Sequence, residues 1–335
     1  MKPLETVKWG TIGCGDVTEV KSGPALQLCE GSELVAVMRR TTEKAEDYAR
    51  RHQIPKWYDD SDKLINDPDV NAIYVATQPD THHYYTIKAL NAGKPVYVEK
   101  PMAMNYPQCK EMIDVAEKND LPLFVAFYRR RLPNFLKAKE LVEQNAIGDI
   151  RFVNLNLHSP PSPKDDHPEE RPWRVKPEIS GGGYFVDLAP HQLDFLDYLF
   201  GPIVNPWGIA RNQANLYEAE DIVTAVWEFE SSSAIGNGNW CFTLDKTDEE
   251  DVIEIIGSQG RIELSCFSHA NVYLTRNKQT ETFQFEKPKH VEKPLIQTVV
   301  NELRGMGECP SHGYSGARTN WVMDKILETY YSTIS

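Results

Sequence analysis

The chain has 335 residues, of which 41% are hydrophobic, 10% aromatic and 25% charged. This composition fits a globular protein of about two ordinary domains and excludes a disordered or collagen-like chain. The net charge of -13 repels phosphate backbones and anionic membrane surfaces, so neither nucleic acid nor a membrane is an expected partner.

The cysteines and the apolar runs indicate the compartment. No C-x-x-C pair and no zinc-type spacing occurs, so we expect a reducing, cytoplasmic location and no bound metal. No signal core precedes Val7, and no apolar run approaches the roughly 20 residues of a membrane span.

Between Val7 and Phe127, short apolar runs alternate with amphipathic segments such as 42–53 and 105–119. The runs are VKWGTIG, LVAVM, AIYVAT, PVYVEK and LPLFVAF. Strands that are apolar throughout are covered on both faces. Residues 1–127 are therefore predicted to form an α/β domain with a doubly wound parallel sheet of the Rossmann type, which binds dinucleotides.

From residue 128 the pattern changes. A helix over 133–144 and a strand over 151–158 precede a Pro-rich loop, 159–180, long enough for a lid. After a helix near 192–200 come the partly alternating segments DIVTAVWEFE, NGNWCFTL, DVIEIIG, RIELSCF, NVYLTR and ETFQFE, and then helices over 294–306 and 315–332.

These segments predict the second domain, 128–335. It is expected to be an α+β domain with a large, mainly antiparallel open sheet and helices on one face. Residues 253–264 predict a hairpin in which Gly257 and Gly260 supply positive φ angles. Because a sheet with a spare face often pairs, we expect a homodimer or homotetramer that binds substrate in this domain.

A glycine loop follows the first apolar run. Gly13, Gly15, Asp16 and Val17 match G-x-G-x-x-G, with Thr18 in place of the third glycine. Gly13 permits the tight turn, and Gly15 lets the backbone approach a pyrophosphate at the start of the next helix. The alternative is a simple strand-to-helix turn.

Arg39 and Arg40 end the second apolar run, where NAD-binding folds carry an acidic residue for the ribose hydroxyls. An arginine holds a 2'-phosphate through charge-assisted hydrogen bonds. The preferred cofactor is therefore NADP, with NAD use still possible. The alternative is two solvated arginines.

Three residues are candidates for acid-base chemistry. Lys100 follows the PVYV strand at the edge where ligands bind open α/β sheets, although many such lysines are surface cations. Asp187 and His191 follow a Gly-Gly-Gly run and share a face if the segment is helical, so Asp187 could fix the histidine tautomer. Because Pro190 is tolerated only in a first turn, the helix is expected to start near Asp187. The alternative is that Asp187 caps the helix and His191 packs.

The segments GCGDV, ATQPDTHH, VEKPMAM and GGGYFVDLAPHQLD occur in this order. Together they resemble the Gfo/Idh/MocA family of glucose-fructose oxidoreductase and inositol dehydrogenase relatives, over nearly the whole chain. The resemblance implies that Lys100 assists acid-base chemistry at the substrate and that Asp187 and His191 are the catalytic pair. It also places four residues beside the nicotinamide: Thr77, Pro79, His82 and Glu99. Thr18, Arg39 and Pro190 depart from the family pattern.

The expected activity is hydride transfer between NAD(P) and a secondary alcohol or carbonyl of a sugar, cyclic polyol or related small molecule. His191 would take the hydroxyl proton while Lys100 stabilises the oxygen. Arg129, Trp173 and Arg174 are candidates for contacts with substrate hydroxyls. Alternatives are an NAD-dependent glycoside hydrolase of the same family and a non-catalytic dinucleotide-binding regulator.

Overall fold

The computed structural model describes residues 1–332, and its contacts divide the chain into two compact units. The first unit comprises Met1–Arg130 and Pro288–Ala317, and the second comprises Arg131–Lys287 and the chain from Arg318 onward. After the second sheet the chain therefore returns to the first unit. The two contiguous domains expected from the sequence, 1–127 and 128–335, do not include this return of residues 288–317 to the first unit.

The first unit is built on a six-stranded parallel sheet of order β3-β2-β1-β4-β5-β6. Its strands are β1 (Val7–Ile12), β2 (Ser32–Met38), β3 (Lys56–Tyr58), β4 (Ala72–Val75), β5 (Val96–Val98) and β6 (Leu123–Val125). The predicted Rossmann-type sheet is confirmed, and its five apolar runs are β1, β2, β4, β5 and β6. The edge strand β3 was not predicted, because it has three residues and none is buried.

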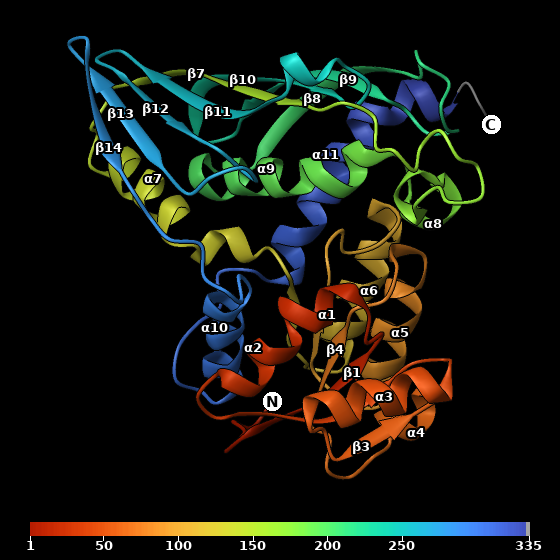
Figure 1. Cartoon of the computed structure of the whole chain (residues 1–335). Coiled ribbons are helices and arrows are strands. Elements are labelled where there is room, and N and C mark those ends of the chain that lie inside the picture. Colours follow the sequence, from red (N-terminus) through yellow and green to blue (C-terminus); the bar gives the residue numbers. More distant parts are fainter. Residues whose placement is uncertain (333–335) are drawn as a thin grey trace. The chain divides into compact units, whose positions relative to one another are not determined.

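The helices of the first unit pack along its parallel sheet (Figure 1). They are α1 (Asp16–Val20), α2 (Gly23–Leu28), α3 (Thr42–His52), α4 (Ser61–Ile65), α5 (Pro79–Asn91), α6 (Tyr106–Lys118) and α10 (Lys293–Leu303). The helices predicted over 42–53 and 105–119 are confirmed as α3 and α6. Strands β4, β5 and β6 are buried at every residue, as expected of strands covered on both faces. The returning helix α10 packs against α2.

The second unit contains an eight-stranded sheet of order β14-β13-β12-β11-β7-β10-β9-β8. Its strands are β7 (Ile150–His158), β8 (Ile203–Arg211), β9 (Ile222–Phe229), β10 (Ser232–Cys241), β11 (Glu250–Gly257), β12 (Arg261–Leu264), β13 (Val272–Arg276) and β14 (Gln279–Phe283). Only the pair β7 and β10 is parallel within the described sheet, so the predicted mainly antiparallel sheet is confirmed. The edge strand β8 was missed; it contains Pro206, which edge strands tolerate.

Helices cover one face of this second sheet (Figure 1). The helices of this part of the chain are α7 (Pro133–Glu143), α8 (Pro177–Ser180), α9 (Tyr184–Phe200) and α11 (Gly313–Ser332). Helix α7 packs on β12 and β13, and α9 packs on β9 and β10. The alternating burial along β9 leaves the opposite face open. No helix within residues 1–332 is both long and apolar enough to cross a bilayer.

The hairpin predicted over 253–264 is present, but the predicted role of its glycines was wrong. Neither Gly257 nor Gly260 has a positive φ. A Cβ on Gly257 would lie 2.2 Å from the Ile147 carbonyl oxygen, and one on Gly260 would lie 2.4 Å from that of Thr275. The glycines are needed for close approach of neighbouring backbone, not for an unusual backbone angle.

The start of α9 also differs from the prediction. The helix begins at Tyr184, so Pro190 lies in its interior and not in its first turn. A proline there removes one helical hydrogen bond. Most side chains of α9 are buried, and this tertiary packing compensates for the missing bond.

Candidate active site

The glycine loop joins β1 to α1 in the first unit. Gly13 has a φ of +95°, and a Cβ there would lie 2.8 Å from the Ala76 carbonyl, so this position requires glycine. A Cβ on Gly15 would meet nothing within 4 Å. Gly15 is the N-cap of α1, and no described side chain caps it. Asp16 and Val17 open the helix, so the backbone on this side is accessible to a pyrophosphate, and the loop fits a dinucleotide.

Thr18 is accommodated in place of the third glycine. Its side chain is buried, and its hydroxyl donates to the Gly15 carbonyl at 2.7 Å. The Tyr48 hydroxyl donates to the Thr18 carbonyl, also at 2.7 Å. Thr18, in place of the third glycine of the motif, therefore stabilises the first turn of α1 and leaves the space beside Gly15 open.

Arg39 lies over the glycine loop. It directly follows β2, and its Nη1 donates to the Cys14 carbonyl at 3.1 Å. Arg40 is exposed, and its charge opposes the rise that burial causes in the pKa of Asp80. Of the two arginines, Arg39 is thus the one held against the loop that would carry the phosphates.

His82 links two loops at the same edge of the sheet. It is buried, and its ring nitrogens lie 2.9 Å from the Pro101 carbonyl oxygen and 3.0 Å from that of Thr77. Burial lowers the pKa of His82 to about 4, so the ring is neutral at neutral pH and its single N–H donates to only one of these two carbonyl oxygens. The ring itself is not exposed to a ligand; it holds the loops that follow β4 and β5. Pro79 starts α5 in the first of these loops.

Glu99 and Lys100 follow β5 directly. The Glu99 carboxylate is buried and accepts hydrogen bonds from the Tyr74 hydroxyl at 2.6 Å and from the Lys100 amide at 3.3 Å. Lys100 itself is half-buried. Gly13, Thr77 and Lys100 therefore follow the carboxyl ends of three adjacent strands, β1, β4 and β5, which is the position predicted for Gly13 and Lys100.

Glu292 is a neighbour of this motif that the sequence did not reveal. It immediately precedes α10, is 1% exposed, and lies within hydrogen-bond reach of Glu99. Burial raises the pKa of both carboxyls, and the charge of Glu99 raises that of Glu292 further. Lys21 and Lys100 oppose this rise. Two close, buried carboxyls resist carrying two negative charges at once, which favours a proton shared between them.

We expect Glu292→Gln to gain stability over the wild type as the pH rises from 4.5. A raised carboxyl pKa in the folded state contributes stability below the unfolded value of 4.5, and this contribution is lost as the pH rises through the folded value. Glutamine keeps a donor toward Glu99 but has no proton to lose. Urea unfolding at pH 5, 6.5 and 8 measures the trend, with the exposed Glu308→Gln as control. A stability difference that does not change with pH would contradict the shared proton.

In the second unit, α9 carries the predicted catalytic pair. Asp187 and His191 are one turn apart and both are buried. The Asp187 carboxylate accepts a hydrogen bond from Arg174 Nε at 2.7 Å. Arg174, assigned to the substrate from sequence, thus forms an ion pair with Asp187, and its guanidinium also stacks on the Trp173 ring at 4.7 Å.

Phe267 is a second residue that the sequence did not reveal. Its ring packs edge-on against the His191 imidazole, with centroids 5.9 Å apart. The Asp251 carboxylate fixes this loop by accepting hydrogen bonds from the amides of Cys266, Phe267 and Ser268 at 2.7 to 3.1 Å. These hydrogen bonds hold the loop with the Phe267 ring against the His191 imidazole.

Two further sequence assignments look different in the structure. Arg129 is 4% exposed, and its guanidinium stacks on the Tyr128 ring, so it occupies a packing position and not an open surface. The predicted lid, 159–180, is tied down by the buried Asp165. This carboxylate accepts hydrogen bonds from the Tyr184 hydroxyl of α9 and from the Ser162 amide, each at 2.9 Å.

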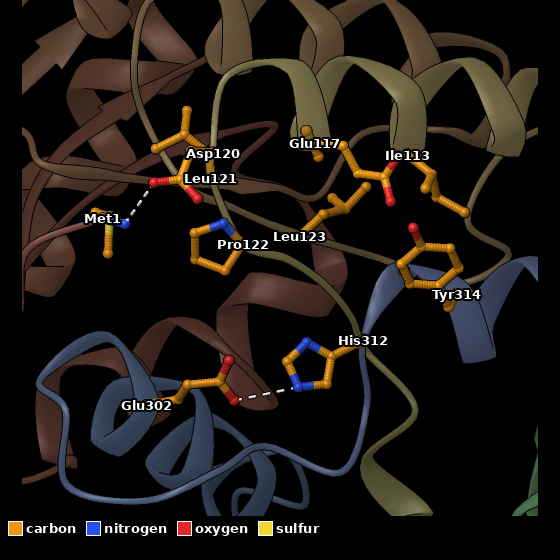
Figure 2. A pocket seen from close by; sticks show the side chains of 12 residues that line it. Met1, Ile113, Glu117, Asp120, Leu121, Pro122, Leu123, Glu302, His312 and Tyr314 are labelled. Atoms are coloured by element: carbon orange, nitrogen blue, oxygen red, sulfur yellow. Dashed lines mark hydrogen bonds and ion pairs between the residues drawn. The ribbon is translucent and has the colours of Figure 1, made fainter.

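A cavity of about 590 Å³ lies elsewhere in the first unit (Figure 2). It is lined by the end of α6, the residues before β6 and the start of α11. Figure 2 shows Glu302 paired with His312, and the Met1 amine paired with Asp120. Because residues before β6 lie at the amino end of a parallel strand, this cavity is not at the edge that carries Gly13, Thr77 and Lys100.

Comparison with known proteins agrees with this architecture. Residues 7–127 match the GFO_IDH_MocA model, described as an oxidoreductase family with an NAD-binding Rossmann fold, and residues 135–263 match the family's C-terminal domain. Oxidoreductase P35 of Formosa agariphila is 35% identical over 96% of this chain and 99% of its own length. Myo-inositol 2-dehydrogenase of Thermotoga maritima is 29% identical over 90% and 89%.

The fold is shared with solved structures as well. Levoglucosan dehydrogenase in complex with NADH and levoglucosan superposes with a TM-score of 0.85 at 20% identity, over 98% of both chains. The predicted family resemblance is confirmed. The chain belongs to the Gfo/Idh/MocA family of NAD(P)-binding oxidoreductases.

Proposed function

We propose that this oxidoreductase transfers a hydride between NADP and a secondary alcohol or carbonyl carbon of a sugar or cyclic polyol. The observation that carries the proposal is the buried pair Asp187 and His191, one turn apart on α9, in a chain that also presents Lys100 at the carboxyl edge of its Rossmann sheet. Myo-inositol 2-dehydrogenase and levoglucosan dehydrogenase, named for a cyclic polyol and an anhydrosugar, support this substrate class.

Each residue has a distinct role in the proposed reaction. A nicotinamide dinucleotide, when bound, would supply or accept the hydride. In the oxidative direction His191 removes the hydroxyl proton, and Asp187, which Arg174 holds in place, keeps the imidazole oriented. Lys100 donates a hydrogen bond to the reacting oxygen and stabilises its developing negative charge. Phe267 limits rotation of the His191 ring.

The dinucleotide site would be formed by residues of the first unit. Gly13, Gly15, Asp16 and Val17 would hold the pyrophosphate, and Arg39 with Arg40 the 2'-phosphate. Thr77, Pro79 and Glu99 would line the nicotinamide side, with His82 holding their loops. The contact between Arg39 and the Cys14 carbonyl supports NADP over NAD, since it holds a guanidinium against the phosphate loop.

The open face of the second sheet supports a homo-oligomer. Trp207, Val226 and Ile235 are 58%, 44% and 56% exposed there. Beside them, Asn237 donates to Asn154 at 2.7 Å, which satisfies polar groups that a partner would otherwise have to pair. Burial of exposed aromatic and branched side chains against a second copy would be favourable. The mass of the protein in solution, measured by light scattering, tests this assembly.

One assay series tests the reaction. NADP, NAD and their reduced forms are first compared by binding, and sugars and polyols are then screened for changes in nicotinamide absorbance. Stoichiometric NADPH formation with an alcohol is expected. Turnover of a glycoside without net change in the cofactor would indicate a hydrolase instead, and cofactor binding without any turnover would favour a regulator.

A further inference from the structure

The buried carboxyl group of Glu220 lies at the start of α9. Glu220 is 0% exposed and lies two residues before the first residue of β9. Its Oε1 accepts a hydrogen bond from the Gly183 amide at 2.8 Å, and its Oε2 accepts one from the Tyr331 hydroxyl of α11 at 2.6 Å. Both carboxyl oxygens are therefore engaged by residues distant in sequence.

Gly183 is the N-cap of α9, and no side chain of its own can cap the helix. The first amides of a helix need an acceptor from elsewhere, and a negative charge is favoured at this end. Glu220 supplies both. It is thus a cap delivered by another part of the chain, at the helix that carries Asp187 and His191.

The contact between Glu220 and the start of α9 explains why glycines precede this helix. A Cβ on Gly183 would lie 2.5 Å from the Glu220 carbonyl oxygen and 3.1 Å from its Oε1, and a Cβ on Gly182 would lie 3.2 Å from the same Oε1. Only glycine lets the backbone approach the carboxyl this closely. Packing around Glu220 therefore accounts for Gly182 and Gly183, whereas Gly181 has a φ of +85° and ends α8 in the left-handed conformation.

We propose that Glu220, held by Tyr331, is a positioning residue that sets the first turn of α9 and through it the orientation of Asp187 and His191. This inference rests on the proposed function of that pair. Because a helix is rigid over one or two turns, a shift at Gly183 is transmitted to residues four and eight positions further on. Small displacements of catalytic groups reduce turnover strongly.

The charge state of Glu220 changes in the neutral range. Burial raises its pKa to about 7, against the hydrogen bonds from Tyr331 and Gly183, which lower it. The ionisable groups that face it are Tyr330 and Tyr331 on α11, Tyr217 in the preceding loop and its sequence neighbour Asp221. The ionised form is the stronger acceptor for both donors, so the cap tightens as the pH rises.

Two variants test the proposal, with the exposed Glu218→Gln as matched control. Glu220→Gln is expected to lower kcat about 10- to 100-fold, to leave the dissociation constant for NADP unchanged, and to remove one ionisation near pH 7 from the kcat profile. Tyr331→Phe removes a hydrogen bond that favours the carboxylate, so it should move that ionisation to higher pH.

Hydrogen exchange separates this proposal from the proposed reaction. In the wild type, protection of the amides at residues 183–187 should increase between pH 6 and 8, and in Glu220→Gln it should not. This measurement needs no substrate, so it holds even if no alcohol is oxidised, which would overturn only the proposed function. If both variants are folded, match Glu218→Gln in kcat and pH profile, and keep wild-type protection, Glu220 is not a positioning residue.

Discussion

Replacing His191 with alanine is expected to lower turnover by about 10²- to 10⁴-fold, the usual loss when a general base is removed. The affinity for NADP should stay unchanged, because the predicted dinucleotide residues belong to the other compact unit. Steady-state rates and titration of NADPH fluorescence measure the two effects separately.

The structure makes this prediction specific to one ring. His191 is buried and packs on Phe267, whereas His167, in the same unit, is exposed. His167→Ala therefore serves as the control and should retain wild-type turnover. Undiminished turnover in His191→Ala would reject its role as the base. The alternative, that His191 only packs in the core, would then be favoured.

The sequence predicted the first sheet well because its signal is local. Apolar runs such as AIYVAT contain buried strands, in this case β4, whose every residue is covered, and the glycine that follows β1 has the positive φ that its turn requires. Edges were harder. Strand β3 is short and lacks a buried residue, and β8 contains Pro206, so neither produces the usual strand pattern.

The sequence allowed candidate site residues to be predicted only where they belong to a recognisable motif. Lys100, Asp187 and His191 stand in recognisable segments, but the residues that hold them do not. Glu292 approaches Glu99 from the far end of the chain, and Glu220 reaches Gly183 across 37 residues. Such contacts depend on tertiary packing, and neither glutamate lies in a pattern that distinguishes it from a surface carboxylate. The helix start predicted from Pro190 was wrong for the same reason. Burial of α9 outweighs the local preference of proline for the first turn of a helix.

The cofactor preference is the second large effect, and Arg39→Asp should reverse it. Aspartate accepts the ribose hydroxyls of NAD and repels a 2'-phosphate. Losing a charge-assisted hydrogen bond of about 1.5 to 3 kcal/mol corresponds to roughly 10- to 100-fold weaker use of NADP. The ratio of kcat/KM for NADP to that for NAD is the measurement.

Arg40→Asp is the matched comparison, because it makes the same charge change one residue away. Arg39 is held at 3.1 Å from the Cys14 carbonyl, whereas Arg40 is exposed beside Asp80. A change in preference confined to Arg39→Asp would identify its guanidinium as the phosphate reader. An equal change in both variants would mean that only the net charge at this strand end matters. Retention of the original preference in Arg39→Asp would require that another group recognises the phosphate.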